Sequence, residues 1–235
     1  TANTFTGSFN SNGGTTNDSQ PELRGTVSGS LAGNEFVAVY RDGVKIGTAS
    51  ISGTSWSYTD TSGLANASSY SYTVRVEDAA GGGGSASSPY VITLKLSGPS
   101  TKASITAVND DVDPQQGPVP NDGYTNDTAP QVTGTISAAL QAGEKVVVLR
   151  DGAVIGTAKM TDSTHWSFDD TGLSDGRTYT YTARVEDAAG NRGAVSGSYA
   201  ITVDTSVPTQ AATISTVFDN ADPVQGDVAK AQARL

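Results

Sequence analysis

The chain has 235 residues, and its 24 acidic against 14 basic residues give a net charge of -10 at pH 7, so it lacks the basic excess that a nucleic-acid partner requires. It contains no cysteine, which excludes disulfides and thiolate metal sites. No apolar run approaches the ~20 residues that span a bilayer, so we expect no membrane insertion. A low content of Lys and Arg with abundant Thr, Ser, Gly and Asp favours a secreted, extracellular protein exposed at a surface.

The sequence repeats itself at an interval of 109 residues, as from position 41 to position 150, with a one-residue slip around Trp56 and Trp166; we call this interval the repeat spacing. The triplet Arg41 to Gly43 returns as Arg150 to Gly152. At the same interval, the pattern that begins with Ala103, Ile105, Val108 and Asp110 returns as Ala212, Ile214, Val217 and Asp219, so a third copy begins before the sequence ends. A repeated unit of ~100 residues is large enough to bury its own core. We therefore expect two repeats at 1–102 and 103–211, and a truncated third repeat at 212–235.

Apolar and polar residues alternate along most of the first copy, which is typical of strands with one buried face. The alternating sets are Val37 and Val39, Trp56 and Tyr58, Tyr70 to Val76, and Tyr90 to Leu94. An Asp-Gly pair at Asp42 follows the first set and indicates a tight hairpin turn. Because Trp56 and its counterpart Trp166 keep the same spacing to a second aromatic residue, we expect both in the core rather than in a carbohydrate platform.

The second copy predicts seven antiparallel strands near residues 104–108, 131–137, 144–150, 153–160, 165–169, 178–186 and 198–204. An odd number of strands delivers the chain to the pole opposite the one where it enters. The expected fold class is therefore all-β, with tandem seven-stranded immunoglobulin-like β-sandwiches arranged end to end.

An acidic connection follows the first predicted strand of the second copy. Between residues 109 and 127 it carries five aspartates and no Lys or Arg; these are Asp110, Asp111, Asp113, Asp122 and Asp127. The next copy repeats the run with Asp219, Asn220 and Asp222. Such crowding of like charge is costly unless a cation binds or water screens it. Calcium accepts carboxylate, carbonyl and water oxygens in flexible geometry, so Asp110, Asp111, Asp113, Asp219 and Asp222 are candidate calcium ligands, with a solvated acidic loop as the alternative.

An ordered set of motifs spans the second copy: Asn126 to Pro130, Arg150 to Gly152, Val185 to Asn191 and Ile201 to Thr205. Together they resemble the bacterial immunoglobulin-like repeats of large Gram-negative adhesins, namely the biofilm-associated proteins and the giant type I-secreted adhesins. The resemblance implies a long, repetitive surface protein, often stiffened by calcium, that acts in attachment and biofilm formation. It also points to Asp127, Asp187 and Asp204 as oxygen donors, with Asn191 in the same loop as Asp187. The first copy departs from it, because Gly82 stands where the second has Asn191.

The strand count distributes these residues over two poles of the second repeat. The connection 109–130 and Asp204 fall at the pole where the chain leaves, whereas the loop Asp187 to Asn191 faces the preceding repeat. One ion cannot bind all of them, so we expect more than one calcium site, at the junctions between repeats. The alternative for Asp187 is a turn-forming residue whose side chain caps its own loop.

We therefore expect a structural extender of a surface adhesin, not an enzyme. The single histidine, His165, is replaced by Ser55 in the first copy, which argues against catalysis. The expected partners are neighbouring repeats of the same chain and, through other regions, a host or biofilm surface; the chain itself is expected to be a monomer. Two alternatives stay open, a module that binds a glycan or host protein directly, and an accessory domain pair of a secreted enzyme.

Overall fold

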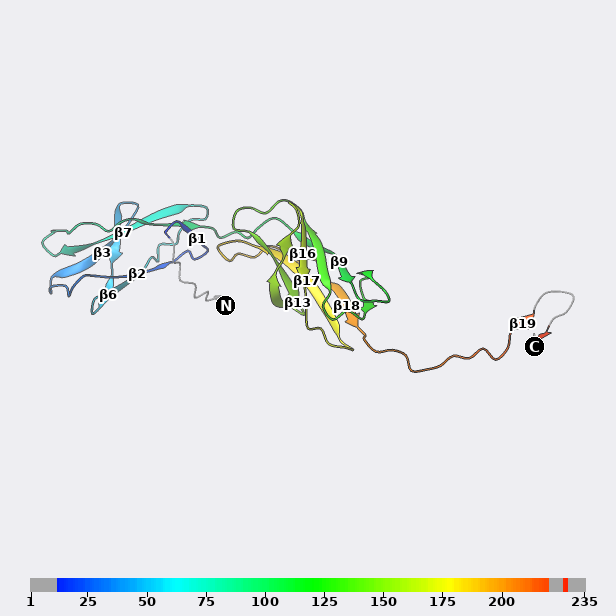
Figure 1. Ribbon diagram of the computed structural model, residues 1–235. Coiled ribbons are helices and arrows are strands. Elements are labelled where there is room, and N and C mark those ends of the chain that lie inside the picture. The colour runs from blue at the N-terminus through cyan, green and yellow to red at the C-terminus, as the bar shows by residue number, and fades with distance from the viewer. Residues whose placement is uncertain (1–11, 220–225, 228–235) are drawn as a thin grey trace.

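The computed structural model describes residues 12–219 and 226–227, and this part of the chain contains strands and no helix. Two strand-rich bodies follow one another along the chain (Figure 1). We call them domain 1, with strands β1 to β8, and domain 2, with strands β9 to β18. In each domain two sheets form a sandwich, which confirms the all-β fold class. The end-to-end stacking and the boundaries of the three repeats stay predictions, and residues 1–11, 220–225 and 228–235 lie outside the described residues.

Domain 1 has a five-stranded and a three-stranded sheet. The larger sheet has the order β1-β8-β7-β3-β4 and the smaller has the order β2-β6-β5. The strands are β1 (Gly14–Thr16), β2 (Glu22–Thr26), β3 (Glu35–Arg41), β4 (Val44–Thr48), β5 (Ser50–Ser52), β6 (Ser55–Thr59), β7 (Ser69–Asp78) and β8 (Tyr90–Leu94).

Domain 2 has two five-stranded sheets, with the orders β10-β9-β12-β16-β15 and β11-β18-β17-β13-β14. The strands are β9 (Ala103–Asp110), β10 (Gly117–Val119), β11 (Gly123–Thr125), β12 (Gln131–Ile136), β13 (Lys145–Arg150), β14 (Ala153–Thr157), β15 (Lys159–Met160), β16 (His165–Asp169), β17 (Thr178–Glu186) and β18 (Tyr199–Val203). A last hairpin, β19 (Phe218–Asp219) with β20 (Gly226–Asp227), repeats the pairing of β9 with β10.

The structure corrects the predicted strand list of domain 2 at two places. The expected strand 153–160 is two strands in different sheets, because the chain crosses between the sheets at the buried Ala158. The acidic connection contains two short strands: β10 pairs antiparallel with β9, and β11 pairs parallel with β18. The second pairing ties the acidic connection to the last strand of the domain.

Each core lies between the two sheets of its domain. In domain 2 a single cluster of buried side chains is centred on Trp166, which is 1% exposed, as the sequence predicted. Gly134 makes room for this indole ring, because a Cβ atom there would lie 2.2 Å from Trp166 and 2.1 Å from the Ser104 carbonyl oxygen. Domain 1 has two smaller clusters instead, one around Trp56 and one around Tyr72.

Arg, Asp and Tyr side chains bridge the two sheets of each domain. In domain 2, Arg150 on β13 contacts both oxygens of buried Asp170 at 2.8 Å, and the Tyr181 hydroxyl on β17 donates to Asp170 at 2.7 Å. Asp170 follows β16 of the opposite sheet. Domain 1 repeats this bridge with Arg41, Asp60 and Tyr72, so the charged group buried between the sheets is paired in both copies.

Burial and hydrogen bonding act in opposite directions on the bridge of domain 1. Burial of Asp60 disfavours its charge, but hydrogen bonds from Ser62, Tyr72 and Arg41 outweigh burial and hold the pKa of Asp60 below its ordinary value. Burial and the bond to Asp60 raise the pKa of the Tyr72 hydroxyl. The bridge therefore consists of a carboxylate, a neutral phenol and a guanidinium.

Candidate functional site: the domain junctions

Two buried carboxylates meet where the acidic connection of domain 2 returns to the sandwich. Asp110 ends β9 and Asp127 follows β11, and they are 6% and 3% exposed. Thr125 joins them, because its hydroxyl donates to Asp110 Oδ2 at 2.6 Å and accepts from the Asp127 amide at 3.0 Å. The other Asp110 oxygen accepts the Val112 amide at 2.7 Å. We call Asp110 and Asp127 the acidic pair.

Backbone amides and hydroxyls surround the acidic pair. The Ala129 amide donates to Asp127 Oδ1 at 2.7 Å, and the Asp111 amide lies 3.5 Å from Asp127 Oδ2. Within residues 12–219, no ion pair joins Asp110 or Asp127 to a basic side chain. Two carboxylates that are removed from water without a basic partner repel each other, and the amide and hydroxyl hydrogen bonds described above offset part of that cost.

Asp111 and Asp113 lie in the exposed part of the acidic connection. Gln116 closes it by donating to the Asp111 carbonyl and to Asp113 Oδ1, both at 3.1 Å. Asn126 donates to the Asp113 carbonyl at 2.8 Å. These contacts hold the loop next to the acidic pair but leave both exposed carboxylates with free oxygen positions for water or an ion.

Asp204 lies beside the same pole, directly after β18. Its amide donates to the Thr125 carbonyl at 2.8 Å, which places it next to the acidic pair. Its Oδ1 accepts the Ser206 amide and hydroxyl. Asp219 forms part of β19, and Asp222 lies outside the described residues. Among the described side chains, no group of three or more His, Cys, Asp or Glu is already arranged around a common metal position.

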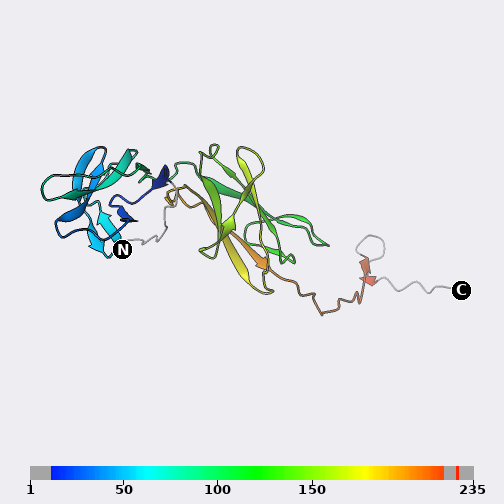
Figure 2. The same cartoon turned by 60° about the vertical axis from the view of Figure 1, so that its left-hand side comes forward.

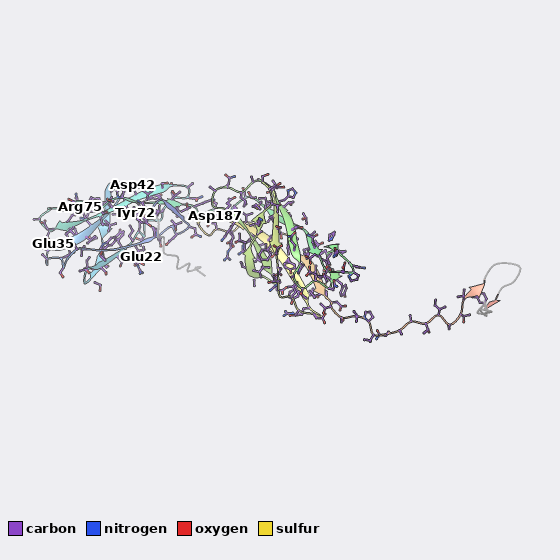
Figure 3. All side chains as sticks on the ribbon, viewed as in Figure 1. Glu22, Glu35, Asp42, Tyr72, Arg75 and Asp187 are labelled. Atoms are coloured by element: carbon purple, nitrogen blue, oxygen red, sulfur yellow. The ribbon has the colours of Figure 1, made fainter. Side chains whose placement is uncertain are left out.

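Asp187 and Asn191 lie at the other pole of domain 2, against domain 1. The loop after β17 uses Asp187 Oδ1 for its own backbone, accepting the Ala189 and Asn191 amides at 2.9 Å. This is the capping role that the sequence left as an alternative. Asp187 Oδ2 accepts the Asn191 side-chain amide at 3.1 Å and lies 3.2 Å from the ammonium group of Lys95 in domain 1. Figure 3 shows the labelled Asp187 between the two bodies.

Lys95, which directly follows β8, is the cation of this junction. Its Nζ also lies 4.0 Å from Glu144, and its carbonyl accepts the Asn191 side-chain amide at 2.7 Å. Asn17 of domain 1 donates to Asn191 Oδ1 at 3.3 Å. Burial opposes the charge of Asp187, but hydrogen bonds from Asn191 and Lys95 outweigh it and lower the pKa of Asp187. We call Lys95, Asp187, Glu144, Asn191 and Asn17 the lysine junction.

The backbones of the two domains also touch at the lysine junction. A Cβ atom on Gly98 would lie 2.4 Å from the Arg192 carbonyl oxygen, and one on Gly193 would lie 3.0 Å from the Pro99 carbonyl oxygen. Only residues without side chains allow this approach. Asp187 and Asn191 are therefore brought together with domain 1, and are separated from the acidic pair by the length of domain 2.

Lys95 and Glu144 were not among the predicted site residues, because only Asp and Asn side chains were considered as ligands and no basic partner was expected at this junction. The repeat spacing contained the signal, since the interval from Lys95 to Asp204 equals the interval from Arg41 to Arg150. Lys95 and Asp204 have matching positions in the structure. The Lys95 amide donates to the Thr16 carbonyl, and the Asp204 amide donates to the Thr125 carbonyl, both at 2.8 Å. The far pole of domain 2 therefore carries an aspartate at the position where the junction with domain 1 carries a lysine.

His165, the only histidine, is the exposed first residue of β16, and its Nδ1 lies 2.8 Å from Asp162 Oδ2 in the preceding turn. This contact links two exposed side chains three residues apart. No helix among the described residues is long and apolar enough to cross a membrane.

Comparisons with known proteins agree with the fold of domain 2. Residues 102–205 match the family model described as bacterial Ig-like domain. The chain is 33% identical over 180 residues to Exoglucanase B of Cellulomonas fimi, a match that covers 75% of this chain and 15% of that protein. The chain therefore spans a small part of the curated relative that it matches.

Solved structures resemble the chain only loosely. A protein of Corynebacterium diphtheriae matches with a TM-score of 0.33 and 15% identity, covering 84% of this chain and 51% of that one. An alpha-L-rhamnosidase of Streptomyces avermitilis matches with a TM-score of 0.30 and 16% identity, covering 79% of this chain and 23% of that one. Over residues 102–205 the chain thus matches a bacterial Ig-like domain, in its sequence and in its two-sheet sandwich.

Proposed function

We propose that the chain is an extender segment of a longer bacterial surface or secreted protein, in which polar junctions hold successive Ig-like domains in fixed relation. The lysine junction is the observation that carries this proposal. A flexible linker would let neighbouring domains swing, whereas Lys95 from domain 1 contacts two carboxylates of domain 2 at 3.2 and 4.0 Å. The side chains of Asp187 and Glu144 are 2% and 5% exposed, so separation of the domains would leave both without their cation.

The next junction needs an added cation. Asp204 stands in place of Lys95 there, so the charge at this position is reversed. The acidic pair, Asp111 and Asp204 offer carboxylate oxygens at one pole, and a further repeat would approach them with the counterparts of Asp187 and Asn191. Calcium takes six to eight oxygen ligands and suits such a place. When calcium binds only the aligned domains, it stabilises that alignment by an amount that grows with the logarithm of its free concentration.

An extender of this kind holds a binding domain away from a cell. Adhesion and biofilm formation are the roles that the adhesin resemblance implies, and they place the chain outside the cell. The partners are then the neighbouring repeats of the same chain, with contact to a host or biofilm surface made by other regions.

The experiment compares the two poles of domain 2 in the full chain. Titration calorimetry on protein stripped of ions is expected to record calcium binding at up to millimolar levels, the range of weak extracellular sites. Small-angle scattering is expected to give the same arrangement of domains 1 and 2 with calcium and with chelator, because Lys95 needs no ion. Absence of any heat of binding would remove the calcium part of the proposal, and independent motion of the two domains would remove the extender part.

A second candidate function rests on the similarity to Exoglucanase B. That similarity favours an accessory segment of a secreted polysaccharide-degrading enzyme, which either spaces its modules or binds glycan directly. A glycan array and a pull-down with insoluble glucan distinguish these cases. A spacer retains no glycan, whereas a binding module gives saturable retention that substitutions in its exposed loops abolish.

A further inference from the structure

An asparagine side chain anchors the strand β1 of domain 1. Asn12 precedes β1, and its Oδ1 accepts the Val91 amide at 2.6 Å while its Nδ2 donates to the Pro89 carbonyl at 2.9 Å. The next residue, Gly13, donates its amide to the Val91 carbonyl at 2.8 Å. These three hydrogen bonds extend the parallel pairing of β1 with β8, which itself involves only Gly14 to Thr16 of β1.

Asn12 and Gly13 form the residue pair in which an asparagine loses its side-chain amide most readily. The Gly13 nitrogen attacks Asn12 Cγ, the bond from Cγ to Nδ2 breaks, and Nδ2 leaves as ammonia with the proton of the Gly13 amide. Water then opens the resulting succinimide ring to aspartate or to isoaspartate. Ring closure needs room at the second residue, and a Cβ atom on Gly13 would have no atom within 4 Å.

The pairing of β1 with β8 protects this reactive pair in the folded chain. Both reacting groups are held by β8, because the Gly13 amide and the Asn12 side chain form hydrogen bonds with Val91. The ring can therefore close only after β1 has left β8. Asn12 and Gly13 are exposed and β1 has three residues, which is typical of a segment that opens locally at low cost in free energy.

Domain 2 contains a matched copy of this anchor with a different second residue. Asn121 precedes β11, and its Oδ1 accepts the Ala200 amide at 2.7 Å. The Asp122 amide donates to the Ala200 carbonyl at 2.8 Å, as the Gly13 amide donates to Val91. Asp122 and Gly13 both have left-handed backbones, with φ of 61° and 89°. The Asp122 side chain crowds ring closure, and its charge opposes loss of the amide proton, so Asn121 should keep its amide.

We propose that Asn12 is a deamidation site of the folded chain, and that loss of its amide releases β1 from β8. The carboxylate of the product has no proton to donate to the Pro89 carbonyl, so two acceptor oxygens face each other where the hydrogen bond had been. Isoaspartate also lengthens the main chain by one carbon before Gly13, which shifts Gly13 away from the Val91 carbonyl.

Release of β1 also affects the contact with domain 2. The strand β1, dark blue, lies at the end of domain 1 that faces domain 2 in both views (Figures 1 and 2). Its last residue, Thr16, accepts the Lys95 amide at 2.8 Å, and the following Asn17 donates to Asn191 of domain 2 at 3.3 Å. Deamidation should therefore loosen the lysine junction. This effect rests on the proposed extender function, whereas the deamidation itself does not.

Peptide mapping by mass spectrometry tests the modification on the full chain. Folded chain and chain unfolded in urea are incubated at the same mildly alkaline pH, and the side-chain amides of Asn12 and Asn121 are followed over time. Asn12 should convert in the folded chain, more slowly than in the unfolded chain, while Asn121 keeps its amide. The proposal is overturned if folded chain retains Asn12 under conditions where unfolded chain loses it, or if both asparagines convert at equal rates.

Two reciprocal substitutions test the role of the second residue. Gly13→Asp gives domain 1 the Asn-Asp pair of domain 2 and should protect Asn12; aspartate tolerates the left-handed backbone, as Asp122 shows. Asp122→Gly gives domain 2 the Asn-Gly pair and should make Asn121 convert. Conversion of Asn12 in Gly13→Asp at the rate of the wild type would contradict the proposal.

The Asn12→Asp variant tests the consequence separately from the reaction. It carries the charge of the product from the start and should lower the unfolding midpoint of domain 1 by about 4 °C. An unchanged midpoint would overturn the release of β1. Small-angle scattering should show a broader distribution of distances between the domains. A lowered midpoint without this broadening would support the release of β1 and count against the part that rests on the extender function.

Discussion

Replacement of Lys95 by alanine should weaken the coupling between domains 1 and 2. Exposed ion pairs contribute ~0.2–1 kcal/mol, and loss of one partner of a fully buried pair costs ~3–5 kcal/mol. Lys95 is 39% exposed while Asp187 is 2% exposed, so solvent screens part of the interaction. We expect a loss of about 1–2 kcal/mol, which lowers the ratio of docked to undocked domains roughly five- to thirty-fold.

Small-angle scattering and calorimetry measure this loss. The Lys95→Ala chain should show a broader distribution of interdomain distances and a lower unfolding midpoint for domain 2, by roughly 4 °C per kcal/mol. Lys102→Ala is the matched control, because Lys102 is exposed and forms no ion pair among the described residues. Equal behaviour of the two variants would refute the role of Lys95.

A charge reversal at the same position tests the relation between the two junctions. Lys95→Asp places an aspartate between domains 1 and 2, at the position that Asp204 occupies at the far pole of domain 2. Three carboxylates then face one another without a cation, so the domains should separate in chelator and dock again in millimolar calcium. Failure of calcium to restore docking would contradict the proposal that an ion and a lysine occupy equivalent positions.

Three further predictions concern single features. Asp110→Asn with Asp111→Asn should reduce the rise in the unfolding midpoint that calcium causes. The midpoint in chelator should stay unchanged or increase, because the double change removes two like charges. Scanning calorimetry in calcium and in chelator checks both results. Gly134→Ala should destabilise domain 2 by at least ~1–3 kcal/mol in urea unfolding, because its Cβ would lie 2.1 Å from the Ser104 oxygen, whereas Gly197→Ala, with open space around it, should stay within ~0.5 kcal/mol. The pKa of Asp60 is lowered from its ordinary 3.8. Its contribution to the stability of domain 1 is therefore complete above pH 3.8 and is lost as the pH falls through the lower pKa of the folded state. Acid unfolding followed by circular dichroism should show this loss of stability in the wild type and not in Asp60→Asn.

Strict alternation of apolar and polar residues made the bounds of two strands predictable to the residue. The predicted strands 165–169 and 178–186 coincide with β16 and β17, because each has one face in the core and one in water. The short strands β10 and β11 were not predictable in this way. They have three residues each and include Gly117, Pro118 and Gly123, so their pairing depends on β9 and β18 rather than on local pattern.

The candidate site was predictable where it depends on one domain and not where it depends on two. The proximity of Asp110, Asp127 and Asp204 follows from the strand order of a single sandwich. The partner of Asp187 belongs to another domain, so the sequence pattern of domain 2 contains no sign of it. A lysine in a linker is common on protein surfaces, and only its buried partners show that it holds a junction.

The parallel pairing of β11 with β18, repeated by β1 with β8, determines how the chain responds to tension. A pull on the two ends of domain 2 loads β9 first and then draws β11 and β18 in opposite directions along their own axes. The hydrogen bonds between them are then loaded in shear and must break together, whereas in a peeling geometry they would break one after another. Single-molecule stretching should therefore record one high force peak for domain 2. A tether built from such units would resist flow at a surface without lengthening.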